Sequence, residues 1–113
     1  MAIRSAVVRR AIEAELPWSR TEDLVAAVNE IATNTLVHGG GRGRLRIWRQ
    51  ENTLVSEIRD SGQIDDPMIG RVAPPEQQEG GRGVWLANQL CDLVQVRSLD
   101  SGSVVRLHMR AGR

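Results

Sequence analysis

The spacing of hydrophobic residues in this 113-residue chain changes at the glycine run Gly39–Gly41. Before this run, apolar residues recur at intervals of three or four, which predicts a helix over residues 2–15 and a second one from about 19 to 37. After the run, apolar and charged residues alternate, as at residues 44–49, which predicts strands. The chain is therefore expected to combine helices and strands in one fold.

Local signals set the predicted boundaries. Pro17 ends the first helix, because proline lacks the N–H that a helix interior needs, and Ser19 or Thr21 caps the second. The remaining predicted elements are two strands joined by a hairpin turn at 50–52, a helix over 82–90, and two strands near 92–98 and 103–109. This order of helices and antiparallel hairpins predicts a two-layer α+β sandwich.

Composition narrows the class of protein. A chain of this length forms one domain, here 1–113, and its formal charge of +1 disfavours a dedicated nucleic-acid binder. No apolar run reaches the length of a membrane span, and the N-terminus has no uninterrupted signal-peptide core. The single cysteine, Cys91, fits a reducing compartment. We therefore expect a cytoplasmic protein without membrane or direct nucleic-acid partners.

Glu30 and Asn34 lie four residues apart in the second predicted helix, so both side chains project from one helix face. A carboxylate and an amide oxygen placed in this way suit Mg²⁺, which binds oxygen ligands and keeps water and phosphate oxygens as its other ligands. A solvated Glu–Asn pair has the same spacing. Taken alone, the spacing favours this simpler interpretation.

Asp60 ends a predicted strand on the same face as Ile58, so its carboxylate is expected to point toward the helices. A carboxylate in that position needs hydrogen-bond donors, which a purine amine, an arginine or backbone amides could supply. Gly62 would let a flat group approach the backbone closely. The Asp-x-Gly sequence is also common in ordinary turns.

Residues 61–81 contain three prolines and four glycines, too many for regular structure, and the stretch is too long for an idle connection. We therefore expect a functional loop. It leads through Gly80–Gly83 into the short helix. Free amides at a helix N-terminus form a phosphate cradle when glycines make them accessible, and Arg82 would add positive charge. A flexible hinge with a helix cap fits these residues equally well.

Other reactive side chains do not form a recognisable site. His38 and His108 are far apart in the sequence and there is one cysteine, so no zinc cluster is indicated. No G-x-S-x-G sequence marks a nucleophilic serine. Cys91 is expected to be a buried packing residue. The four arginines between residues 42 and 49 are interpreted as mainly a solvated strand face.

The order of these motifs resembles the GHKL ATP-binding superfamily, and within it most closely the bacterial anti-sigma serine kinases. NEIATNTLVHGG looks like their N box, EIRDSG like their adenine-binding box, GGRGVWLANQLCD like their phosphate-binding box and SGSVVRLHM like their closing strand. The resemblance covers residues 23–109. It implies the Bergerat ATP-binding fold, with a mostly antiparallel sheet and helices on one face.

The resemblance also implies a role for each motif residue. Glu30 would be the catalytic carboxylate that orients or deprotonates the attacking hydroxyl, and Asn34 would hold Mg²⁺ against the ATP phosphates. Asp60 would accept a hydrogen bond from the adenine amino group, and Gly62 would admit the ring. The other implied ATP-binding residues are Gly81, Arg82 and Gly83 near the phosphates and Ser103 near adenine.

The implied protein is a bacterial serine/threonine kinase that uses ATP and Mg²⁺, with residues 63–81 as its ATP lid. It would phosphorylate a serine of an anti-sigma antagonist protein and hold a sigma factor by protein–protein contact. Members of the group can also form homodimers. The alternative is a non-catalytic nucleotide-binding or interaction module, for example within a larger transcription-regulatory or sensor protein.

Overall fold

The computed structural model describes residues 2–38, 43–60, 82–99 and 102–111. In chain order its elements are α1 (Ala2–Glu13), α2 (Trp18–His38), β1 (Gly43–Gln50), β2 (Thr53–Asp60), α3 (Arg82–Leu90), β3 (Leu93–Leu99) and β4 (Gly102–Arg110). This order is the predicted one, and the boundaries of most elements agree to within one or two residues. Of the helices in the described ranges, none combines the length and apolar character that a membrane-spanning segment needs.

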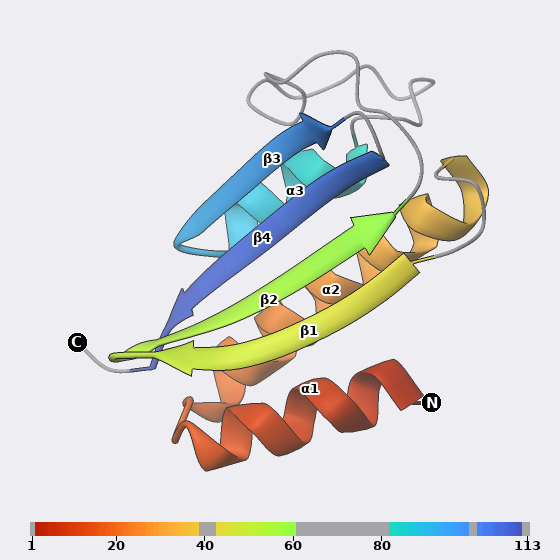
Figure 1. Cartoon of the computed structure of the whole chain (residues 1–113). Coiled ribbons are helices and arrows are strands. Elements are labelled where there is room, and N and C mark those ends of the chain that lie inside the picture. Colours follow the sequence, from red (N-terminus) through yellow and green to blue (C-terminus); the bar gives the residue numbers. More distant parts are fainter. Residues whose placement is uncertain (1, 39–42, 61–81, 100–101, 112–113) are drawn as a thin grey trace.

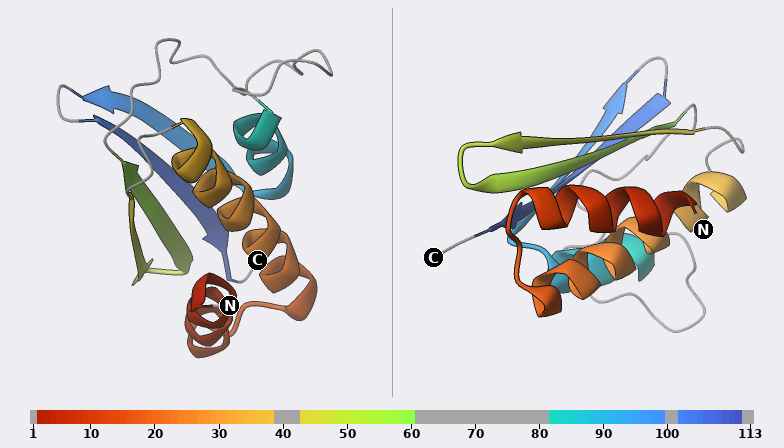
Figure 2. Two further views of the ribbon diagram at one scale, coloured as in Figure 1. Left: turned by 90° about the vertical axis from the view of Figure 1, so that its right-hand side faces the viewer. Right: turned by 90° about the horizontal axis from the view of Figure 1, so that it is seen from below.

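The four strands form one sheet in the order β1-β2-β4-β3, and each neighbouring pair is antiparallel. The three helices lie on one face of this sheet and leave its other face open (Figures 1 and 2). The predicted two-layer α+β sandwich is therefore confirmed. β1 and β3 are the edge strands, while β2 and β4 form the centre of the sheet.

The first helix ends earlier than predicted, and proline is not the cause. α1 stops at Glu13, and Glu15 adopts a left-handed φ of 59°. The Leu16 N–H donates to the Ala11 carbonyl at 2.9 Å and the Glu15 N–H to the Ile12 carbonyl at 3.0 Å, which is the bond pattern of a Schellman cap. The chain has already left the helix when it reaches Pro17.

The predicted caps of the second helix are wrong. α2 begins at Trp18, so Ser19 and Thr21 lie within its first turn. An N-cap side chain accepts a hydrogen bond from the helix, whereas Thr21 Oγ1 donates to the carbonyl oxygens of Pro17 at 3.1 Å and Leu16 at 3.4 Å. Buried Thr21 therefore ties the connection between α1 and α2 to the start of α2.

The hydrophobic core fills the space between the sheet and the helices. It is aliphatic, because the chain contains no Phe or Tyr. Alternation along β2 and β4 directs every second side chain into this layer. The buried core residues are Val7, Ala11, Ala14, Leu16, Leu24, Ala27, Val28, Ile31, Leu54, Ile58, Val84, Ala87, Cys91, Val94, Val105, Leu107, Met109 and Ala111. They include apolar residues at helical spacing in both predicted N-terminal helices, such as Val7 and Ala11 in α1 and Leu24 and Val28 in α2.

Candidate functional site

Four segments that carry predicted site residues reach one end of the sandwich. These are the C-terminal ends of α2 and β2 and the N-terminal ends of α3 and β4 (Figures 1 and 2). β2 and β4 pair in a register that sets Asp60 directly opposite Ser103. α3 packs against α2. Residues from motifs that are far apart in the sequence are thereby gathered at this end.

Asp60, at the end of β2, and Ser103, near the start of β4, contact each other at this end of the sandwich. Ser103 Oγ donates a hydrogen bond to Asp60 Oδ1 at 2.8 Å, and Ser103 is 2% exposed while Asp60 is half-buried. Asp60 shares its strand face with Ile58, which packs into the core, so it lies on the helical side of the sheet as predicted. A carboxylate offers about four lone-pair positions, and the Ser103 hydroxyl occupies one of those on Oδ1. This arrangement suits the recognition of an amine.

The α2 residues of the predicted site lie on consecutive turns. Glu30 is half-buried, beside the buried stripe that contains Ala27 and Ile31. Asn34 follows one turn later in the same helix, and its side chain lies outside the described residues. Within the described part of the chain, no group of three His, Cys, Asp or Glu side chains could hold a metal ion.

The start of α3 contributes backbone groups. Arg82 is its first residue and Gly83, which is buried, is its second. The first N–H groups of a helix have no partner within it, and the helix dipole makes this end positive, so it favours an anion. The side chain of Arg82, together with Gly62, Gly81 and the predicted lid at 63–81, lies outside the described residues.

Cys91 does not belong to this chemistry. It is buried in the core cluster, and loss of hydration by burial, with a smaller contribution from the charge of Asp92, raises the pKa of its thiol to about 12. A thiol with such a pKa stays protonated at neutral pH and is a poor nucleophile. The prediction of a packing residue is confirmed.

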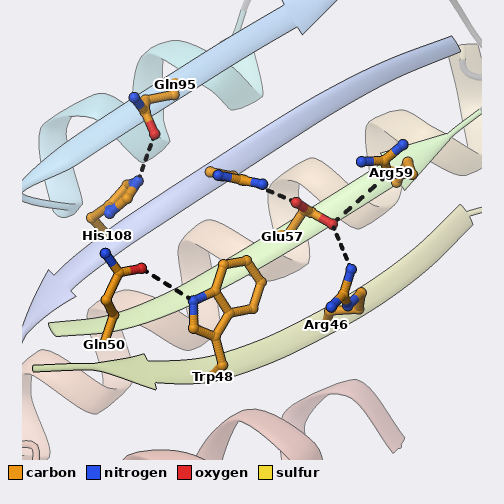
Figure 3. Close-up of polar contacts among 8 residues, drawn as sticks. Arg46, Trp48, Gln50, Glu57, Arg59, Gln95 and His108 are labelled. Carbon is orange, nitrogen blue, oxygen red and sulfur yellow. Dashed lines mark hydrogen bonds and ion pairs between the residues drawn. The ribbon is translucent and has the colours of Figure 1, made fainter.

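Sequence reasoning missed a buried carboxylate on the open face of the sheet (Figure 3). Glu57 is 1% exposed, and its Oε2 accepts a hydrogen bond from Arg106 Nε at 2.9 Å. Arg46 and Arg59 each lie 3.8 Å from its Oε1. Alternation in β2 could have indicated this position, because it sets Glu57 on the face opposite Ile58. The contact between Glu57 and Arg106 of β4 could not be predicted in this way, because no nearby sequence pattern indicates which residues two distant strands place opposite each other.

The same open face carries a hollow of about 260 Å³. Three arginines, one glutamine and two valines line it: Arg59, Arg97, Arg106, Gln95, Val96 and Val104. Asp60 and Ser103 lie on the helical side of the sheet. The hollow is therefore separate from the site that the sequence predicted.

Known proteins match both the sequence and the fold of this chain. Residues 1–109 match the family of histidine kinase-like ATPase domains. The chain is 32% identical over 98 residues to serine-protein kinase RsbW of Halalkalibacterium halodurans, an alignment that covers 76% of this chain and 60% of that protein. The chain thus spans about three-fifths of the length of this curated relative.

Two solved structures show the same arrangement of elements. The histidine kinase domain of the Erythrobacter litoralis EL346 blue-light activated histidine kinase gives a TM-score of 0.69 at 16% identity, covering 96% of this chain and 61% of that one. Acinetobacter baumannii histidine kinase AdeS gives 0.62 at 12% identity, covering 96% of this chain and 65% of that one. Because both sequence identities are below 25%, the structural similarity establishes the fold of this chain and nothing beyond it.

Proposed function

This chain belongs to the family of histidine kinase-like ATPase domains, and we propose that it binds Mg-ATP and transfers the γ-phosphoryl group to a serine of an antagonist protein. The proposed site is the end of the sandwich where α2, β2, α3 and β4 meet. The observation that carries the proposal is the part-buried Asp60–Ser103 pair at the end of the sandwich where α3 also begins. The 32% identity to a serine-protein kinase supports serine as the acceptor.

Asp60 recognises adenine in this proposal. The hydrogen bond from Ser103 fixes one carboxylate oxygen, so the carboxylate is oriented before the ligand arrives. A carboxylate is an acceptor and therefore matches the exocyclic amino group of adenine, which is a donor. Guanine carries a carbonyl acceptor at the corresponding ring position and would face the carboxylate with like partial charge. The site is therefore expected to prefer ATP over GTP.

The start of α3 binds the phosphates. Its first N–H groups, which have no partner within the helix, and the positive end of its dipole attract the anionic chain, and Gly83 has no side chain to keep phosphate oxygens away. Gly81 and Arg82 are proposed to complete this cradle, with Gly62 beside the adenine ring and residues 63–81 as the lid. These assignments rest on the sequence motifs.

Glu30 and Asn34 supply the oxygen donors near the reacting group. Their residue types fit Mg²⁺, which prefers carboxylate and amide oxygens, and Asn34 is the proposed ligand. A bound Mg²⁺ would neutralise phosphate charge. Glu30, half-buried on α2, is proposed to orient the attacking serine hydroxyl and take up its proton as the oxygen–phosphorus bond forms and ADP leaves.

The proposed partners are an anti-sigma antagonist, which provides the serine, and a sigma factor, which the domain holds by protein–protein contact. Both are implied by the resemblance of the sequence motifs to the anti-sigma serine kinases. The chain aligns with only 60% of the length of its relative RsbW. The activity and the partners of the whole protein are therefore proposed together with the function of this domain.

Phosphorylation of a candidate antagonist from the source organism tests the function. The protein is incubated with Mg-ATP and the antagonist, and phosphoserine is located by mass spectrometry. Glu30→Gln should reduce transfer by about 100-fold or more and leave ATP affinity nearly unchanged, because it removes a general base without changing side-chain size. Glu22→Gln is the matched control on the same helix, where Glu22 is exposed and pairs with Arg4.

Undiminished transfer by Glu30→Gln would contradict the catalytic role of Glu30. Intact Mg-ATP binding with no transfer to any candidate antagonist would favour the alternative, a nucleotide-binding regulatory module without kinase activity.

A further inference from the structure

The open face of the sheet concentrates positive charge. Opposite residues of an antiparallel pair share a face, and the strand register brings six arginines to this one. They are Arg44 and Arg46 of β1, Arg59 of β2, Arg97 of β3 and Arg106 and Arg110 of β4, and we name this set the arginine face. Glu57 is the carboxylate that the described strands place among them. The whole chain carries a formal charge of only +1, so its charge is unevenly distributed.

Part of the arginine face is held in a fixed arrangement. Arg106 donates to Glu57 Oε2 at 2.9 Å, with Arg46 and Arg59 near the other oxygen (Figure 3). The guanidinium carbons of Arg46 and Arg106 also lie 5.6 and 5.5 Å from the centre of the Trp48 ring, within cation–π range. Glu57 and Trp48 therefore fix these side chains in advance of any binding.

The rest of the face retains uncompensated charge. Of the residues that the structure describes, none forms an ion pair with Arg44 or Arg97, and both arginines are exposed. Arg97 lines the hollow of about 260 Å³ together with Arg59 and Arg106. Glu57 engages Arg59 and Arg106, whereas Arg97 has no carboxylate partner among the described residues, so this depression offers one uncompensated guanidinium group to an anion.

We propose that the arginine face is a docking surface for an acidic segment of a partner protein, whose carboxylates pair with Arg44 and Arg97. Charge complementarity identifies this occupant. Guanidinium groups match carboxylates in planar, bidentate geometry. A second copy of the chain would present the same six arginines, and like charges would repel.

A nucleic acid fits this face less well. Single-stranded nucleic acids bind sheet faces by stacking bases on aromatic rings, but the Trp48 ring is engaged by Arg46 and Arg106. The arginine face also lies across the sheet from Asp60 and Ser103, so this inference does not rest on the proposed kinase activity.

Fluorescence anisotropy of a labelled, glutamate-rich peptide tests the proposal. The paired variant Arg44→Gln/Arg97→Gln removes two charges from the arginine face without touching the contacts of Glu57. Arg4→Gln/Arg9→Gln removes the same charge from exposed positions on α1, on the helical side of the sheet. Thermal unfolding of both variants verifies that they fold.

We expect salt-sensitive peptide binding that weakens about tenfold in Arg44→Gln/Arg97→Gln and less than about twofold in the α1 control. Saturating Mg-ATP should leave the affinity unchanged, because the two surfaces lie on opposite sides of the sheet. Absence of peptide binding, or equal loss in both double variants, would overturn the proposal. Tighter binding of an oligonucleotide of equal charge, lost in the same arginine variant, would also overturn it and assign the face to nucleic acid.

Discussion

Ser103 Oγ donates a 2.8 Å hydrogen bond to Asp60 Oδ1 across the antiparallel pair of β2 and β4. The two residues lie 43 positions apart and come from separate sequence motifs. Their contact joins the start of β4 to the end of β2 at the edge of the proposed nucleotide site. It gives Ser103 a specific role: it is a positioning residue that orients the carboxylate of Asp60.

Removal of this hydroxyl should weaken nucleotide binding. In Ser103→Ala, Asp60 loses a donor that holds it in place, and we expect Mg-ATP affinity to fall by about tenfold, since a hydrogen bond to a charged group contributes roughly 1.5–3 kcal/mol. Calorimetric titration provides the measurement. Ser103→Thr keeps the hydroxyl and is expected to retain most of the affinity. Equal affinity in wild type and Ser103→Ala would show that the contact does not position Asp60 for binding.

The left-handed residue at the end of α1 predicts a stabilising substitution. Glu15 has a φ of 59°, where a Cβ is unfavourable, and glycine adopts this conformation freely. Glu15→Gly should raise the free energy of unfolding by about 0.5–1 kcal/mol, measured by urea denaturation. The same substitution at Glu13, the last residue of the helix, should lower it instead, because glycine loses more backbone entropy in a helical conformation. A loss of stability in Glu15→Gly would contradict the Schellman cap.

Burial of Cys91 predicts slow thiol chemistry. Because desolvation raises the pKa of its thiol to about 12, the thiolate is scarce near pH 8 and the sulfur is shielded. An aromatic disulfide reagent should modify the folded protein at least about 100-fold more slowly than the urea-unfolded chain, where the pKa is ordinary. Equally fast labelling of both forms would contradict the buried position.

His108 predicts part of the pH dependence of stability. Its Nε2 lies 2.8 Å from Gln95 Oε1, and desolvation, then the charge of Arg106, lower the pKa of the imidazole below its ordinary value of 6.5. As the pH falls through 6.5, the unfolded chain therefore takes up a proton before the folded one does. The neutral imidazole of His108 therefore contributes its full stability to the fold above pH 6.5. This contribution is lost as the pH falls from 6.5 toward the lower pKa of the folded protein.

Urea denaturation at about pH 7.5 and about pH 5 checks this linkage. Stability should fall less on acidification in His108→Gln than in wild type, because glutamine does not titrate. A variant that loses as much stability as wild type between the two values would show that His108 makes no contribution.

Residues close in sequence determined what could be predicted about the fold. The helical stripes that contain Val7 and Leu24, and the start of α3 at Arg82, follow from spacing and glycine signals within a few residues. The direction of Asp60 followed from alternation with Ile58. These features depend on local backbone geometry, so a single sequence was sufficient to predict them.

Features that depend on pairing or on an unusual backbone angle were missed. Glu57 is neutralised mainly by Arg106, a residue 49 positions away whose strand register no local pattern reveals. The end of α1 depends on Glu15, which adopts a left-handed conformation more common for glycine. Because a glutamate gives no such signal, Pro17 was predicted to end the helix. Likewise, Thr21 resembles a cap by residue type, but its hydroxyl donates toward the preceding turn.

The most direct test of the account is calorimetric titration of Mg-ATP into the wild-type protein and into Asp60→Asn. The substitution keeps the shape of the side chain but places an amide, with its own N–H donors, where the adenine amino group requires an acceptor. We predict binding by the wild type and loss of at least about 100-fold in affinity in Asp60→Asn. Equal binding by both proteins, or binding by neither, would contradict a nucleotide site built on Asp60.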